Sequence, residues 1–89
     1  MADRPMDSFC SMLADLMAQT RAEIHVLIRR AVGLEDRLAR LEGRPDSDPG
    51  EIDRLRADLA AVDGQLVGAQ DRLRLVENEY NFARNPVLG

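Results

Sequence analysis

The chain is poor in the residues that build catalytic sites, metal sites and covalent cross-links. It contains one cysteine, one histidine, one tyrosine, two phenylalanines and no tryptophan. A single cysteine cannot form a disulfide within the chain, and Cys10 has no second cysteine or histidine at the spacing of a zinc site. His25 falls on a position that we predict to face solvent. We therefore expect no metal and no cofactor, and we predict that the protein is not an enzyme.

Lysine and long apolar runs are missing as well. The twelve basic residues are all arginine and stand against sixteen acidic residues, which gives a formal net charge of −4 and no long-range attraction to nucleic acid. No apolar run approaches the roughly 20 residues that a membrane-spanning helix needs. The N-terminus lacks the apolar core of a signal peptide. We therefore expect a cytoplasmic protein without a membrane partner.

What the chain has instead is two rows of apolar residues spaced alternately three and four apart. This spacing places a row on one face of a helix and is typical of coiled coils. The first row is Met6, Cys10, Leu13, Met17, Thr20, Ile24, Leu27, Ala31, Leu34, Leu38 and Leu41. The second row is Ile52, Leu55, Leu59, Val62, Leu66, Ala69, Leu73, Val76, Tyr80, Ala83 and Val87.

The segment between the rows favours a hairpin. Residues 43–50 hold two prolines and two glycines, which argues against one continuous parallel coiled coil, although the heptad phase continues across them. When the chain folds back, Leu41 meets Ile52 and Ile24 meets Ala69. The sequence predicts an all-α fold, an antiparallel two-helix coiled-coil hairpin that assembles into a helical bundle or ring. Its single domain, 1–89, divides into a helix over about 5–42, a loop over 43–50, a helix over about 49–84 and a tail over 85–89.

Residues at the loop suit these boundaries. Gly43 is expected to adopt the left-handed conformation that closes a helix, and Pro45 prevents continuation. Asp48 is expected to cap the second helix, with Pro49 at its first position and Glu51 placed as in a capping box.

Charges beside the two rows agree with the antiparallel alignment. The pairs brought close are all attractive: Arg37 with Asp58 or Glu51, Arg30 with Asp58, Glu23 with Arg72, Glu35 and Glu42 with Arg56, and Arg21 with Glu77. A parallel self-pairing of the first helix also satisfies some of these charges, so charge alone does not exclude it.

Apolar and small residues outside the rows carry the functional signal, because the hairpin does not need them. A helix that is apolar on more than one side is buried on more than one side. The residues predicted to form an oligomer interface are Phe9, Met12, Leu16, Ile28, Val32, Gly64, Gly68 and Leu75. Close approach of another helix would explain the two glycines, whereas chance drift in a genome that favours alanine and glycine codons is the alternative.

The open end of the hairpin gathers all the aromatic residues, and aromatic anchors dominate interface energetics. The residues predicted to dock a larger partner are Tyr80, Phe82, Val87 and Leu88. In the alternative interpretation, Phe9 and Tyr80 complete the core and the tail is a frayed terminus.

Basic residues cluster toward the loop. The candidate nucleic-acid contacts are Arg29, Arg30, Arg37, Arg40 and Arg44. Acidic residues are interleaved over the same span, so a solvated mixed-charge face is the favoured interpretation and nucleic acid is not the favoured partner.

One stretch resembles an enzyme family. Residues 55–67 (Leu-Arg-Ala-Asp-Leu-Ala-Ala-Val-Asp-Gly-Gln-Leu-Val) resemble the opening helix of the all-helical chorismate mutases. That family would imply a helical dimer whose arginines bind substrate carboxylates. Leu73 stands where the family has a downstream catalytic arginine, one residue from Arg72, so the pattern departs from the family at a residue that its chemistry needs.

The sequence leads to three hypotheses of function. The first is an oligomerisation adaptor that self-associates through helical hairpins and docks one larger protein. The second is a phage-type DNA-packaging adaptor, because a hairpin with a short C-terminal tail is similar in layout to the oligomerisation core of small terminase subunits. The third is a helical chaperone or regulator of one specific partner.

Overall fold

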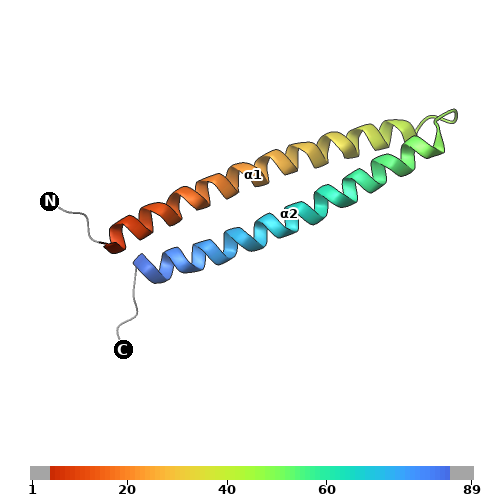
Figure 1. The fold of residues 1–89 in the computed structure, drawn as a ribbon. Coiled ribbons are helices and arrows are strands. Elements are labelled where there is room, and N and C mark those ends of the chain that lie inside the picture. Colours follow the sequence, from red (N-terminus) through yellow and green to blue (C-terminus); the bar gives the residue numbers. More distant parts are fainter. Residues whose placement is uncertain (1–4, 85–89) are drawn as a thin grey trace.

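Two long helices lie side by side and run in opposite directions, joined by one short loop (Figure 1). The computed structural model describes the backbone of residues 5–84 and the side chains of residues 8–84. Helix α1 spans Pro5–Glu42 and helix α2 spans Pro49–Arg84. At a rise of about 1.5 Å per residue, α1 is about 57 Å long. This arrangement confirms the predicted all-α antiparallel hairpin.

The two predicted rows form the seam between the helices. Every row position whose side chain is described is buried or half-buried. The central cluster gathers four row residues from each helix: Ile24, Leu27, Ala31 and Leu34 from α1, and Leu59, Val62, Leu66 and Ala69 from α2. Heptad spacing therefore determines which residues are buried between the helices.

Thr20 is the polar residue of the seam, and its hydroxyl is satisfied within its own helix. The side chain is buried, and Oγ1 donates a hydrogen bond of 2.8 Å to the carbonyl oxygen of Leu16. A threonine that bonds the carbonyl one turn earlier can lie in an apolar seam without leaving a polar atom unpaired. Within the described side chains, no buried polar atom lacks a hydrogen-bond partner.

The end of α1 differs from the prediction at Gly43. The φ angle of this residue lies outside the left-handed region, so the expected left-handed closure is wrong. Instead the Gly43 amide donates to the Ala39 carbonyl at 3.1 Å, which extends the helical hydrogen-bonding pattern by one residue. The Leu41 carbonyl then accepts from the Arg44 amide at 3.2 Å and from the Ser47 hydroxyl. Turn and side-chain hydrogen bonds therefore close the helix without a left-handed glycine.

Asp48 caps the start of α2 as predicted, but Glu51 does not complete the expected capping box. Asp48 Oδ1 accepts a hydrogen bond of 3.0 Å from the Gly50 amide, and the Asp48 carbonyl accepts from the Glu51 and Ile52 amides at 3.1 and 3.2 Å. The Glu51 carboxylate turns across the hairpin, and its Oε1 lies 3.7 Å from Arg37 Nη2. Asp48 thus caps the helix, while Glu51 contributes to the contact between helices.

Three ion pairs join the helices on opposite sides of the seam. Arg72 Nη2 lies 2.8 Å from Glu23 Oε1, on the same side as the Arg37–Glu51 pair. Arg56 Nη2 lies 2.8 Å from Glu42 Oε1 on the other side. These are three of the predicted pairs. The described side chains show no ion pair between Arg30 and Asp58, between Arg21 and Glu77, or between Glu35 and Arg56.

Candidate interaction surfaces

The apolar residues outside the seam are on the surface of the hairpin. Each large one is at least 39% exposed, and Phe82, at 67%, is the most exposed of them. The exposed set is Phe9, Met12, Leu16, Val26, Ile28, Val32, Val67, Leu75 and Phe82. Six of the residues predicted for an oligomer interface are in this set, so the hairpin by itself leaves them in contact with water.

The ion pairs divide this surface into two sides, which we name the Arg72 side and the Arg56 side. Residues seven apart in a long helix follow one another along the same side. Phe9 and Leu16 precede Glu23 by two heptads and one heptad, so they lie on the Arg72 side, with Met12 between them.

Helix α2 contributes to the same side. Leu75 stands three residues after Arg72, and Phe82 follows one heptad later. We call the resulting surface the apolar face; its apolar residues are Phe9, Met12, Leu16, Leu75 and Phe82, and the exposed Glu79, one heptad after Arg72, lies among them.

Ile28 and Val32 belong to the other side of the molecule. Ile28 is two heptads before Glu42, and Val32 is one turn after Ile28. Val67, which the sequence analysis did not single out, lies near the Arg56 row of α2. The predicted interface is therefore two separate surfaces. The heptad position of each apolar residue outside the seam would have assigned it to one of these two surfaces from the sequence alone.

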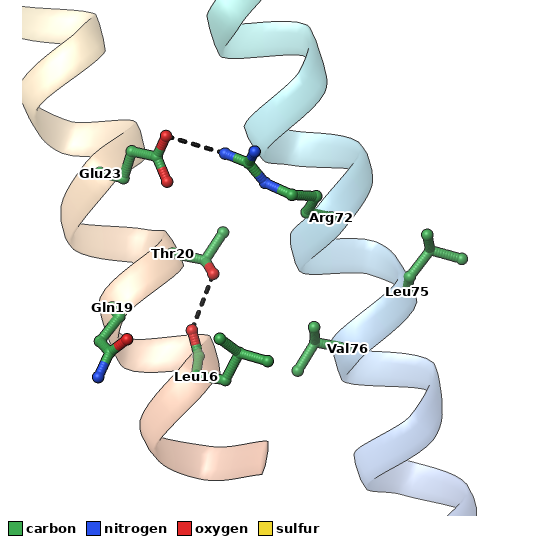
Figure 2. Close-up of a pocket in the computed structure, with 7 residues that line it drawn as sticks. All are labelled: Leu16, Gln19, Thr20, Glu23, Arg72, Leu75 and Val76. Carbon is green, nitrogen blue, oxygen red and sulfur yellow. Dashed lines mark hydrogen bonds and ion pairs between the residues drawn. The ribbon is translucent and has the colours of Figure 1, made fainter. Parts of the chain in front are cut away.

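The apolar face contains an open groove of about 310 Å³ between the helices (Figure 2). Leu16 and Leu75 line it from opposite helices, and the buried Thr20 and half-buried Val76 lie between them. The Glu23–Arg72 ion pair borders the groove toward the middle of the hairpin. The groove therefore offers an apolar floor with a charged pair at one end.

The glycines predicted for close packing are open to solvent. A methyl group added at Gly64 or Gly68 would meet no other atom within 4 Å, and the same holds for Gly33 in α1. The hairpin's own first helix therefore does not use these glycines, and their contact with another helix stays a prediction.

The residues predicted to dock a partner have different surroundings. Tyr80 is half-buried in the seam, as the core interpretation expects, while Phe82 projects from the apolar face. Val87 and Leu88 lie outside the described residues.

The arginines predicted to contact nucleic acid are exposed, and two of them form ion pairs with acidic neighbours. Arg37 faces Glu51, and Arg40 Nη2 lies 2.8 Å from Asp36 Oδ2 one turn earlier. Arg29, Arg30 and Arg44 are exposed side chains. Such pairs neutralise part of the positive charge that phosphate groups would meet.

In the half of the hairpin nearer the loop, which we call the loop half, the two sides differ in charge. On the Arg72 side, the charged residues of the helices are Arg30, Arg37, Arg40, Arg54, Glu51 and Asp58. On the Arg56 side they are Glu35, Glu42, Asp53, Asp63 and Arg56. The apolar face thus continues along the molecule into a surface with net positive charge, and the opposite side of that half is net negative.

The fold defines the class of this protein as an antiparallel helical hairpin. No family model matches the chain, and no curated protein or solved structure gives a match. Neither described helix has a stretch long and apolar enough to cross a bilayer. Among the side chains of residues 8–84, no three from His, Cys, Asp and Glu gather in a way that could hold a metal ion.

Proposed function

We propose that this protein is a non-enzymatic oligomerisation adaptor, which self-associates through its hairpins and docks one larger protein. The observation that carries the proposal is the exposure of large apolar side chains that the seam does not use. Leu75 and Phe82 are 64% and 67% exposed although neither is needed to pair the helices. Contiguous exposed apolar residues on a small protein mark surfaces that bind other proteins.

The small core of the hairpin also supports self-association. Among the described residues, the buried apolar side chains are Leu13, Met17, Leu27, Ala31, Leu55, Val62, Ala69 and Ala83, and three of them are alanines. A two-helix hairpin buries only one stripe of each helix, and oligomerisation is a common way for small domains to enlarge such a core. An interface on the exposed apolar residues would add to this core.

Native mass spectrometry tests the proposal, because the copy number separates a bundle, a ring and a complex with another protein. We expect a discrete homo-oligomer at micromolar concentration, with a matching mass from light scattering. A monomer across the whole concentration range would contradict the adaptor proposal.

A DNA-packaging adaptor is the second candidate, and the basic surface beside the loop is the observation that favours it. Arg30 and Arg37 lie in one row, and assembly into a ring would repeat this row around a common axis. Binding to duplex DNA that weakens steeply with salt would support this function. Absence of binding at low salt would contradict it. A chaperone or regulator of one helical protein would instead bind that protein as a defined hetero-complex.

A further inference from the structure

We infer that two copies of this chain dock through their Arg56 sides about a two-fold axis, with the hairpins antiparallel and the loops at opposite ends. The axis passes near Ile28 and Val67. These residues lie at the same level, because Ile28 is five residues after Glu23 and Val67 is five residues before its ion-pair partner Arg72. The inference rests on the proposed self-association and deepens it, since it assigns the contact to one side and leaves the apolar face to the larger partner.

The first observation is that α2 leaves one row of its seam partly uncovered. In the row next to the Arg72 side, Val76 is half-buried and the other described members are buried. The second row lies next to the Arg56 side, since Leu59 stands one turn from both Arg56 and Asp63. Every described member of this second row is half-buried: Ile52, Leu59, Leu66, Leu73 and Tyr80. A partner on the Arg56 side would therefore cover apolar surface along the whole of α2.

The second observation is an exposed apolar patch in the middle of the same side. Ile28, Val32 and Val67 are 41%, 58% and 57% exposed, and the exposed Ala60 lies one heptad before Val67. A two-fold axis at this level places the patch of one copy on the patch of the other. Each copy then presents the same surface to its partner, as a closed dimer requires.

The third observation is charge, which sets the orientation. We call the half of the hairpin away from the loop the open half. On the Arg56 side, the loop half carries four acidic residues and Arg56, a net charge of −3. The open half of this side carries a net charge of +2, from Arg21, Arg74, Arg84 and Glu77. The two halves of one side are therefore opposite in sign.

Antiparallel docking lays the open half of each copy on the loop half of the other. Each overlap then holds four basic and five acidic residues. Parallel docking lays α1 of one copy on α2 of the other and joins the two loop halves. Arg56 would again meet acidic residues there, but two copies of it would stand among eight acidic residues. Like charges brought together in this way cost binding energy, so the antiparallel orientation is favoured.

Individual residues agree with this orientation. With the axis between Ile28 and its copy, Arg21 lies within about one helical turn of Glu35 of the other copy, and Arg56 lies within about one turn of that copy's Glu77. Among the described side chains, the ion pairs of the hairpin do not include Arg21, Glu35 or Glu77. These three residues are therefore available to a second copy.

Like charges near the axis are kept apart. Asp63 is the charged residue closest to the axis, and it lies opposite the uncharged Gln70 of the other copy, more than one turn from that copy's Asp63. Arg74 approaches Arg56 of the other copy, but Asp71 Oδ1 lies 3.8 Å from Arg74 Nη2 in its own helix. The contact therefore places no acidic residue directly on its own copy.

The size of the contact is that of a specific interface. The overlap covers about 30 residues of α1, which extend about 45 Å, and two helices side by side are about 20 Å wide. The footprint is therefore about 900 Å² per copy and about 1,800 Å² in total, within the range of about 1,200–2,000 Å² for stable complexes.

Two matched substitutions in α1 test the surface. Ile28→Glu places a charge at the centre of the interface, and Leu16→Glu places the same charge on the apolar face at a residue of nearly equal exposure, 42% against 41%. We expect Ile28→Glu to raise the Kd for self-association by at least about tenfold, as at a central interface residue. Leu16→Glu is expected to change it by less than about twofold. Sedimentation equilibrium gives the Kd, and circular dichroism checks that both variants remain helical.

The outcomes separate this inference from the proposed function. If Leu16→Glu dissociates the oligomer and Ile28→Glu does not, self-association stands and the Arg56 side is not its surface. If the unmodified protein is monomeric throughout, both are overturned.

The orientation is tested with the variants Arg21→Glu and Glu35→Arg. Each variant places like charges at both contacts between residues 21 and 35 of its own dimer, so we expect its Kd to rise by at least about fivefold. An equal mixture of the two variants restores both contacts, and its heterodimer should have a Kd within about twofold of that of the unmodified protein. A mixture that associates no better than the separate variants would overturn the antiparallel orientation.

Discussion

Residues next to the loop fix the point at which the chain turns, and each acts through a hydrogen bond. Asp48 caps α2 with a bond of 3.0 Å from the Gly50 amide to Oδ1. Replacing a capping aspartate by alanine leaves a helical amide without its partner and costs about 1 kcal/mol. We expect Asp48→Ala to lower the free energy of unfolding by this amount in a urea titration. Asp46→Ala, two residues earlier at an exposed position, is the control and should change stability by less than about 0.5 kcal/mol. Equal effects of the two substitutions would show that the cap is not the cause.

Gly43 provides a second test at this scale, because its conformation differs from the one expected of a helix-closing glycine. An added Cβ would meet the Ala39 and Arg40 carbonyl oxygens at 3.5 and 3.6 Å, which are ordinary contacts. Alanine restricts the unfolded chain more than glycine does, so a compatible Gly→Ala change stabilises by about 0.4–1 kcal/mol. We expect Gly43→Ala to raise the Tm, as Gly33→Ala should in the exposed middle of α1. A lower Tm for Gly43→Ala alone would mean that the residue is left-handed in solution.

At the scale of the helices, ion pairs on both sides of the seam join α1 to α2. The Glu23–Arg72 pair joins residues far apart in sequence, and both side chains are at least half exposed. Solvent screening limits such a pair to about 0.2–1 kcal/mol. We expect Glu23→Arg and Arg72→Glu each to lower stability by up to this amount, and the double variant to recover most of the loss. A double-mutant cycle from thermal unfolding measures the coupling.

The same cycle on Asp71 and Arg74 is the control, because these residues are 3.8 Å apart within α2 and do not join the helices. High salt should remove the coupling of Glu23 to Arg72. A coupling near zero at low salt would show that the seam alone sets the alignment.

The helices could be predicted from sequence because their information is local and periodic. Heptad spacing identified the seam residues, including Ala31 and Val62 of the central cluster, and the proline-rich loop identified the hairpin. Gly43 was mispredicted because glycine allows the left-handed conformation without requiring it. The side of the molecule on which Ile28 lies was also missed. Its heptad position would have placed it on the side of Glu42 and Arg56, and the ion pairs agree with that assignment of the flanking rows. Leu75 is exposed in the hairpin, and a single sequence does not describe which molecule, if any, contacts it.

For the molecule as a whole, the arrangement of surface types along the hairpin matters more than its total composition. The net charge of −4 hides a positive surface on the Arg72 side and a negative one on the Arg56 side of the loop half. The apolar face lies on the Arg72 side, in the half of the hairpin away from the loop. A partner that approaches the Arg72 side therefore meets apolar side chains at the end away from the loop and a net positive surface near the loop.

If the hairpin self-associates as proposed, its stability depends on its concentration, because association stabilises only the folded hairpin. For a dimer that dissociates on unfolding, a tenfold rise in concentration adds about 1.4 kcal/mol per dimer, which corresponds to a rise in Tm of about 3–6 °C for a chain of this size. We expect this rise in thermal scans of the unmodified protein and of Leu16→Glu. Ile28→Glu should give a Tm that is lower and depends less on concentration. A Tm for the unmodified protein that stays constant across about a hundredfold range of micromolar concentrations would mean that the hairpin folds without a second copy.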